Sequence, residues 1–297
     1  MELRRSAKPS LTPIELNHED TLCFRLSDET VWEMLLLDTG AEVVERKYAQ
    51  KCAPSEEGDI SVYAFWARVV INGQEHELRR EVGTQQSFYE PWELDGVHLW
   101  FDAADAAFSA RGGFMQEKDW LSGQICQPRK RARFAVQEAN RSVCPEPVAL
   151  WYTNPELSLN IEDCYRGEDC WMGPYNGAKA HGGLDINMPA GTFLFAPINF
   201  DNQFYFNSLN AGYANNRWRG VRRWPDSSQW MLQSHHLISL QVEQNRPLNR
   251  GEFYATTAGV LPGAREHTHF VFRVIEQEGE YLLDPWILFW QMFRDVC

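Results

Sequence analysis

Short runs of β-branched and aromatic residues, bounded by polar turns, recur along the chain and constrain its fold more than any other feature. Their partial alternation of apolar and polar residues is typical of strands that cover a core with one face. The runs occupy residues 21–27, 31–38, 60–73, 97–103, 192–198, 229–242 and 268–276. The sequence therefore predicts an all-β protein.

The C-terminal end of the chain departs from this pattern. The stretch DPWILFWQMFRDV begins with Asp284, a residue type that caps helix N-termini, and with Pro285, which suits the first helical turn. We expect a short, mostly buried helix that closes the fold.

A chain of 297 residues is long enough for about two domains. Residues 141–160 contain three prolines and mark the expected boundary. We predict a β-sandwich-like module of unknown role over 1–150 and a second β-rich domain over 151–297. Residues 199–228 are rich in asparagine and aromatic residues, which favours a long ordered loop. Either this loop lines a substrate groove, or its aromatic side chains pack a core of their own.

The charge of the chain bears on its partners. The formal net charge is −13 and both halves are acidic, which argues against nucleic acid or an anionic membrane as the main partner. No stretch is long and apolar enough to span a bilayer, and the N-terminus lacks the apolar region of a secretory signal. The basic run PRKRAR, residues 128–133, is interpreted as a solvated edge or linker.

The seven cysteines leave the redox compartment open. Cys164 and Cys170 are close enough in sequence to be bridged, and Cys144 is nearby. Nothing in the sequence has the spacing of a CxxC metal knuckle.

Five of the eight histidines lie between residues 181 and 269. His267 and His269 are two residues apart in a predicted strand, so both imidazoles share one face, roughly 6.6 Å apart along the strand. His181 precedes Asp185 by four residues, and the glycines between them permit the sharp turn that would bring the two together.

His235 and His236 are neighbours in another predicted strand. Because adjacent strand residues face opposite sides, we expect at most one of them to face a shared site, and spacing alone does not choose between them. Two histidines and one carboxylate would supply three protein ligands to a catalytic zinc ion, which keeps one position open for water. Two further histidines would remain for general base catalysis.

Four stretches together resemble the lysostaphin-type zinc endopeptidases, which cut peptide cross-bridges in bacterial cell walls. YNGAKAHGGLDINMPAGTFLFAPI resembles the family's first motif, H-x-x-x-D followed by a P-x-G-T-like turn and a small apolar strand. HLISLQVEQNRPLNRGEFYATTAG resembles the central stretch, HTHFVFRV the closing H-x-H strand, and DPWILF the terminal Asp-Pro segment. The stretches follow the family's order. The lead into H-x-H, GVLPGARE, and the aromatic segment after LFAPI depart from the family's pattern.

The resemblance implies three zinc ligands, which are His181, Asp185 and His269. It also implies that His236 and His267 are the catalytic histidines that do not bind zinc. His236 is preferred to His235 because it directly precedes Leu237, as in the family's His-Leu pair. Tyr175 occupies the place of a tyrosine that steadies the oxyanion in some members.

The implied protein is a zinc-dependent endopeptidase with a two-sheet β domain and a metal-bearing groove. It would use metal-activated water to hydrolyse peptide bonds, in bacterial cell-wall peptides (peptidoglycan), and would act outside the cell or in the periplasm. The alternative is a non-catalytic scaffold that keeps the peptidase fold and binds a metal, a glycan or a protein. A zinc amidohydrolase that acts on another substrate is a third reading.

Overall fold

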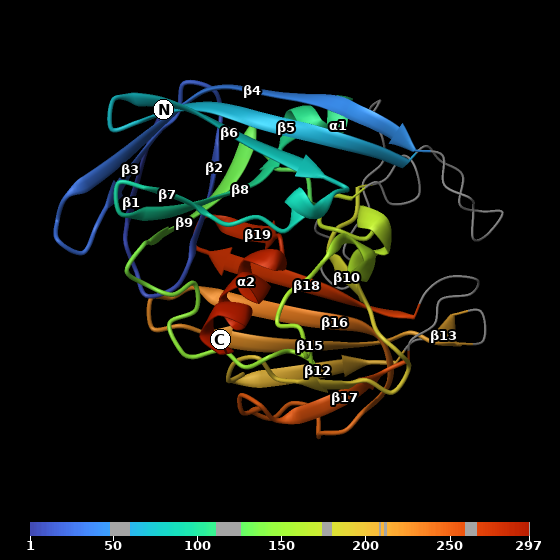
Figure 1. Cartoon of the computed structure of the whole chain (residues 1–297). Coiled ribbons are helices and arrows are strands. Elements are labelled where there is room, and N and C mark those ends of the chain that lie inside the picture. The colour runs from blue at the N-terminus through green and yellow to red at the C-terminus, as the bar shows by residue number, and fades with distance from the viewer. Residues whose placement is uncertain are drawn as a thin grey trace. The chain divides into compact units, whose positions relative to one another are not determined.

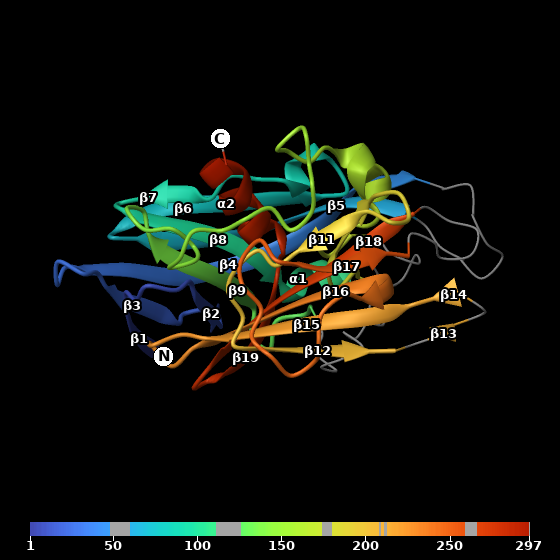
Figure 2. The same cartoon turned by 90° about the horizontal axis from the view of Figure 1, so that it is seen from below.

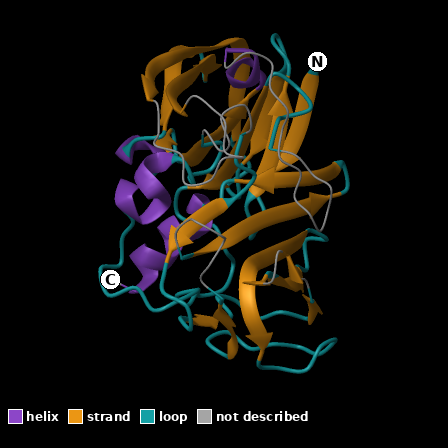
Figure 3. Ribbon diagram, turned by 90° about the vertical axis from the view of Figure 1, so that its right-hand side faces the viewer, coloured by secondary structure: helices purple, strands orange, loops and turns teal. Residues whose placement is uncertain are grey.

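The computed structural model describes residues 1–47, 60–110, 126–173, 180–207, 209–210, 213–258 and 266–296. These residues are mostly strands (Figure 3), which confirms the all-β prediction. They divide into two compact units. The first contains the described residues up to Pro145 together with those of Met172–Gly182, and the second contains Glu146–Trp171 and the residues from Gly183 onward. None of the described helices is long and apolar enough to cross a membrane.

The first unit is a sandwich of two sheets. The order in one sheet is β1 (Glu2–Ser6), β3 (Thr21–Arg25), β4 (Val31–Lys47), β5 (Ile60–Ile71) and β6 (Gln74–Val82). The order in the other is β2 (Thr12–Leu16), β9 (Ala132–Glu138), β8 (Val97–Ala104) and β7 (Trp92–Leu94). The two sheets meet where Phe65 of β5 packs on Phe101 of β8, with ring centroids 4.9 Å apart. The unit also contains η1 (Gln85–Ser87) and α1 (Asp105–Ala110). The predicted sandwich-like module is therefore present.

The basic run PRKRAR was interpreted as a solvated edge or linker. For Arg133 this interpretation is wrong. Arg133 lies in β9 and is only 2% exposed. Its Nε donates to Asp102 Oδ2 at 2.6 Å, and its Nη1 lies 3.4 Å from Glu15 Oε1. A buried guanidinium of this kind is held by the carboxylates that neutralise it. The other basic residues of the run remain partly exposed.

Replacing Arg133 with methionine should lower the free energy of unfolding by about 3–5 kcal/mol, because it leaves the Asp102 carboxylate buried without its cation. Denaturant titration measures this loss. The double variant Arg133→Met/Asp102→Leu should recover part of the stability, since the Arg133–Asp102 pair is then absent and Glu15 keeps its ion pair with Arg129. A double variant less stable than Arg133→Met alone would contradict this account.

The second unit is built on one branched sheet rather than on two separate sheets. The main path runs β10 (Leu184–Asn187), β18 (His267–Glu276), β16 (Gln229–Leu240), β15 (Asn216–Arg223) and β12 (Asn202–Phe206). Strand β19 (Gly279–Leu283) pairs with β18. Strand β17 (Phe253–Thr257) pairs with the C-terminal end of β16 and, on its other side, with β11 (Phe193–Phe195). Figures 1 and 2 show β18, β16 and β15 side by side. We expected two sheets, and they are continuous here because β16 pairs with β17 at one end and with β18 along the rest of its length.

The predicted closing helix is α2 (Trp286–Val296), which is confirmed as mostly buried. The Asp284 carboxylate accepts the Trp286 N–H at 2.9 Å and so caps the first turn. Phe289 of α2 packs on Phe270 of β18, with centroids 5.3 Å apart. The helix thereby covers the face of β18 opposite to that of its two histidines, because neighbouring strand residues alternate between faces.

The expectation of a long loop over 199–228 is wrong. Residues of this segment form the hairpin of β12 and β15, together with the short pair β13 (Leu209–Asn210) and β14 (Tyr213–Ala214). Trp218 is fully buried, stacks on Tyr254 at 4.1 Å and donates its indole N–H to Gln203 Oε1 at 2.8 Å. Trp224 is also buried, against Trp230. These two tryptophans pack the core and do not line a groove.

Candidate metal centre

The pairing of β10 with β18 builds the centre of the site. The register places Asp185 opposite His269 and Asn187 opposite His267. Asp185 Oδ1 lies 2.6 Å from His269 Nδ1, and its Oδ2 lies 3.3 Å from His267 Nε2. The two imidazoles of the H-x-H strand therefore share one face, and one carboxylate contacts both.

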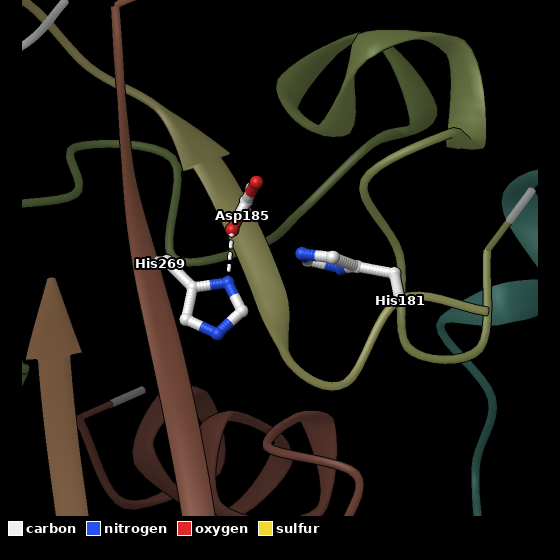
Figure 4. Close-up of side chains that lie close together, drawn as sticks. All are labelled: His181, Asp185 and His269. Atoms are coloured by element: carbon white, nitrogen blue, oxygen red, sulfur yellow. Dashed lines mark hydrogen bonds and ion pairs between the residues drawn. The ribbon is translucent and has the colours of Figure 1, made fainter. Parts of the chain in front are cut away.

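His181 completes a group of three possible metal ligands. It comes from the turn before β10 and points toward Asp185 and His269 (Figure 4). One ligand atom from each of the three residues lies within 4.8 Å of the others. Donor atoms of a tetrahedral zinc site lie about 3.4 Å apart, so the three donors would have to move closer together to hold the ion. Two imidazoles and a carboxylate are ligands that suit zinc, and the residues present fit the ion.

Gly183 makes room for one of these ligands. A Cβ atom at this position would lie 2.4 Å from Cε1 and 2.6 Å from Nε2 of His269. It would also lie 2.6 Å from the Phe270 carbonyl oxygen. Real Cβ atoms essentially never make contacts so short, so a side chain at 183 would displace the His269 ring and press on the backbone of β18. The glycine is therefore required by the close approach of the imidazole.

A bulge in β16 brings both His235 and His236 to this face. Ser234 lies opposite Phe270, so alternation places His235 beside His269, with ring centroids 4.7 Å apart. His236 then adopts a left-handed backbone, with a φ of 61°. This turns its ring to within 4.7 Å of the His267 ring. The expectation that only one of the two histidines could face the site is wrong.

The register of β16 on β15 shows the physical reason. Trp218 pairs with Ser234, and the next pair is Asn216 with Leu237. Three steps on β16 therefore match two steps on β15, which is the extra residue of a β-bulge. The Asn216 side chain donates to the Ile238 carbonyl at 2.8 Å and supports the distorted strand.

Both histidines of the bulge are neutral at neutral pH. Burial lowers the pKa of His235 well below its usual value, and the nearby His269 and His236 add to this effect. Burial also lowers the pKa of His236 well below its usual value, with a further contribution from His267. A neutral imidazole keeps one ring nitrogen as a hydrogen-bond donor and the other as an acceptor.

His235 is the site residue that sequence reasoning left aside. It is 5% exposed, and its Nε2 has no hydrogen-bond partner among the described residues. The sequence gives no signal for the bulge, because apolar residues stand at even and odd positions alike, with Trp230 and Leu232 in one row and Met231 and Leu237 in the other. Tyr175, the remaining predicted residue, lies outside the described residues.

Several solved structures are similar to this chain. The antimicrobial peptidase lysostaphin from Staphylococcus simulans aligns at 18% identity over 38% of this chain and 44% of its own, with a TM-score of 0.32. Its catalytic domain aligns at 17% identity over 38% of this chain and 80% of the domain, with a TM-score of 0.30. A zinc containing peptidase from Vibrio cholerae aligns at 12% identity over 85% of this chain and 84% of its own, with a TM-score of 0.30.

These neighbours are of the lysostaphin type that the motifs predicted. The chain spans less than half the length of the full lysostaphin structure. No protein-family model matches the chain, and no curated protein matches it. At these identities the similarity concerns the fold alone, and the chemistry must come from the side chains of this chain.

Replacing Gly183 with alanine should abolish or strongly weaken zinc binding, because the new Cβ displaces His269. Isothermal titration of the metal-free protein with zinc measures the effect. Gly191→Ala is the matched control. Gly191 has a φ of 84° with open space around its missing Cβ, so alanine there strains the backbone without touching His269. Equal loss of zinc affinity in both variants would contradict a local steric cause.

Proposed function

We propose that the protein is a zinc-dependent peptidase in which His181, Asp185 and His269 hold the metal. The observation that carries this proposal is the convergence of the three donors with three further histidines on one face. When bound, zinc supplies a Lewis acid that polarises a carbonyl group and activates water. The remaining steps belong to the side chains around it.

His236 is suited to accept a proton. Its Nδ1 lies 2.8 Å from Asn215 Oδ1. Because an amide oxygen only accepts hydrogen bonds, Nδ1 carries the ring proton of the neutral imidazole, and Nε2 keeps a basic lone pair. Asn215 is itself buried, so the orientation of the ring is fixed. These features support His236 as a general base.

His267 is suited to transfer a proton in the opposite direction. Its Nε2 faces the Asp185 carboxylate at 3.3 Å, and its ring lies 4.7 Å from that of His236. Because its ring lies against that of His236 and on the same face as His269, we assign His267 to the donation of a proton to the leaving amine, in concert with His236. Tyr175 is proposed to donate to the oxyanion.

We propose a peptide substrate of the bacterial cell wall, with action outside the cell or in the periplasm. The support for this substrate is the resemblance of the motifs and the similarity to lysostaphin, which is described as an antimicrobial peptidase. A panel of cross-linked and linear peptides, assayed with metal-free and zinc-loaded protein, tests the proposal. Elemental analysis of the active protein should give about one zinc per chain. A protein that takes up no zinc on titration, or a zinc-loaded protein inert on the whole panel, would overturn it.

The H-x-H pair allows the roles of ligand and proton donor to be separated. His269→Ala removes a ligand, so zinc content and activity should fall together. His267→Ala should keep the zinc while kcat falls by roughly 10²–10⁴-fold, the usual contribution of acid–base catalysis. Elemental analysis and kinetics on the same preparations measure both quantities.

The exposed His18 of the first unit provides the control, since His18→Ala should change neither zinc content nor kcat. If His267→Ala and His269→Ala lose zinc to the same extent, the division of roles along the strand is wrong.

A further inference from the structure

Two buried cysteines lie at the ends of a tight turn in the second unit. Cys164 is fully buried and Cys170 is 1% exposed. Their thiols are in hydrogen-bond contact with each other, and neither is oxidised in this structure. The two residues are six positions apart, so a bond between them would close a small ring of backbone. The sequence had left this pairing open.

The backbone between the two cysteines is under local strain. The helical backbone of η2 (Ile161–Gly167) is broken at Cys164, and the two residues that follow are left-handed, with φ values of 44° at Tyr165 and 56° at Arg166. Residues with side chains adopt this conformation at a cost of about 1–3 kcal/mol each, and they keep it when the surroundings hold them there. In the present structure, the hydrogen bond from Asp169 N–H to the Cys164 carbonyl, 3.3 Å long, helps to hold the turn.

The same turn supports β10, the strand that carries Asp185. Strand β10 is at the edge of its sheet, so one side of its backbone pairs with no other strand among the residues that the structure describes. The Asp185 N–H donates to the Asp169 carbonyl at 2.9 Å, and the Asn187 side chain donates to the Glu162 carbonyl at 2.8 Å. The segment from Glu162 to Cys170 therefore covers the free edge and fixes the backbone of Asp185.

We propose that Cys164 and Cys170 form a structural disulfide when the protein folds in an oxidising environment, and that this bond stabilises the turn on which β10 rests. In the chemical step, the thiolate of one cysteine attacks a disulfide reagent such as oxidised glutathione and forms a mixed disulfide. The second thiolate displaces the remaining glutathione. The two cysteines together lose two protons and two electrons, and the reagent is reduced to two thiols.

The bond should form during folding rather than in the folded protein. Burial, followed by the hydrogen bond from the neighbouring thiol, raises the pKa of the Cys164 thiol well above its usual value. A thiol that is not ionised and cannot be reached by a reagent is unreactive. In the unfolded chain both thiols are exposed, and only a few residues separate them. During folding, oxidation of the two thiols therefore competes with their burial in the turn.

Mass spectrometry of the refolded protein tests the proposal directly. The full chain is reduced, unfolded, and refolded in a buffer of reduced and oxidised glutathione. Free thiols are then alkylated in denaturant without reductant. The protein is cut with trypsin and with a protease that cleaves after glutamate, because Arg166 lies between Cys164 and Cys170, whereas Glu156 and Glu162 separate Cys164 from Cys144. A bridge between Cys164 and Cys170 then appears as two peptides that are joined through these residues and separate on reduction.

The joined pair should be the main form of these peptides. Complete alkylation of both cysteines would overturn the proposal, and so would a bridge from either of them to Cys144. A reduced, folded sample treated with the same buffer should form the bridge much more slowly than the refolding sample.

The stabilising effect needs a second measurement. The bridged protein should melt about 3–8 °C above its reduced form, given the small loop that the bond closes. The amide of Asp185 should exchange its hydrogen more slowly in the bridged form, because the Asp169 carbonyl stays in place. Cys164→Ser should show neither difference between oxidising and reducing buffers. Cys23→Ser, which changes a partly exposed cysteine of the first unit, should behave as the unsubstituted protein.

Equal melting temperatures of the bridged and reduced forms would overturn the stabilising role. If Cys164→Ser does not fold, the comparison of bridged and reduced unsubstituted protein still decides the question.

Discussion

The site depends first on the antiparallel register between β10 and β18. This register sets Asp185 opposite His269, so that the carboxylate can contact both imidazoles of the H-x-H pair. A shift by one residue would turn Asp185 to the opposite face of the sheet, where the core packs against α2. The carboxylate would then be buried among apolar side chains without a partner, which is strongly unfavourable. The alternation of apolar and polar residues along β18 thus fixes the register that places Asp185 beside His267 and His269.

The bulge in β16 places two further histidine side chains on the same face. A regular strand could present one histidine of the His235–His236 pair, whereas the left-handed backbone at His236 presents both. One ring then lies against His269 and the other against His267. Bulges recur beside active sites because they re-aim side chains without breaking the sheet. Here the bulge separates two environments, one beside His269 and one beside His267.

The support for β10 comes from outside the sheet. Carbonyl groups of the Glu162–Asp169 segment accept hydrogen bonds from the Asp185 N–H and from the Asn187 side chain, which ties the edge of the strand to this segment. On its other side, Gly183 lets the His269 ring approach the backbone closely. Backbone contacts on both sides of β10 therefore set the position of the Asp185 carboxylate. The contacts of this carboxylate with His267 and His269 depend on that position.

The sequence by itself determined the strand content, the capped C-terminal helix and the shared face of His267 and His269, because these follow from local periodicity and from capping chemistry. The motifs also selected the three ligand candidates. Only the tertiary structure decided that His235 joins the site, that Arg133 is buried with Asp102, and that Trp218 belongs to the core. Each of these depends on a partner distant in sequence: a register break against β15, a carboxylate on a neighbouring strand, and an aromatic ring on β17. Local patterns carry no information about such partners, since burial and register are fixed when the strands pair.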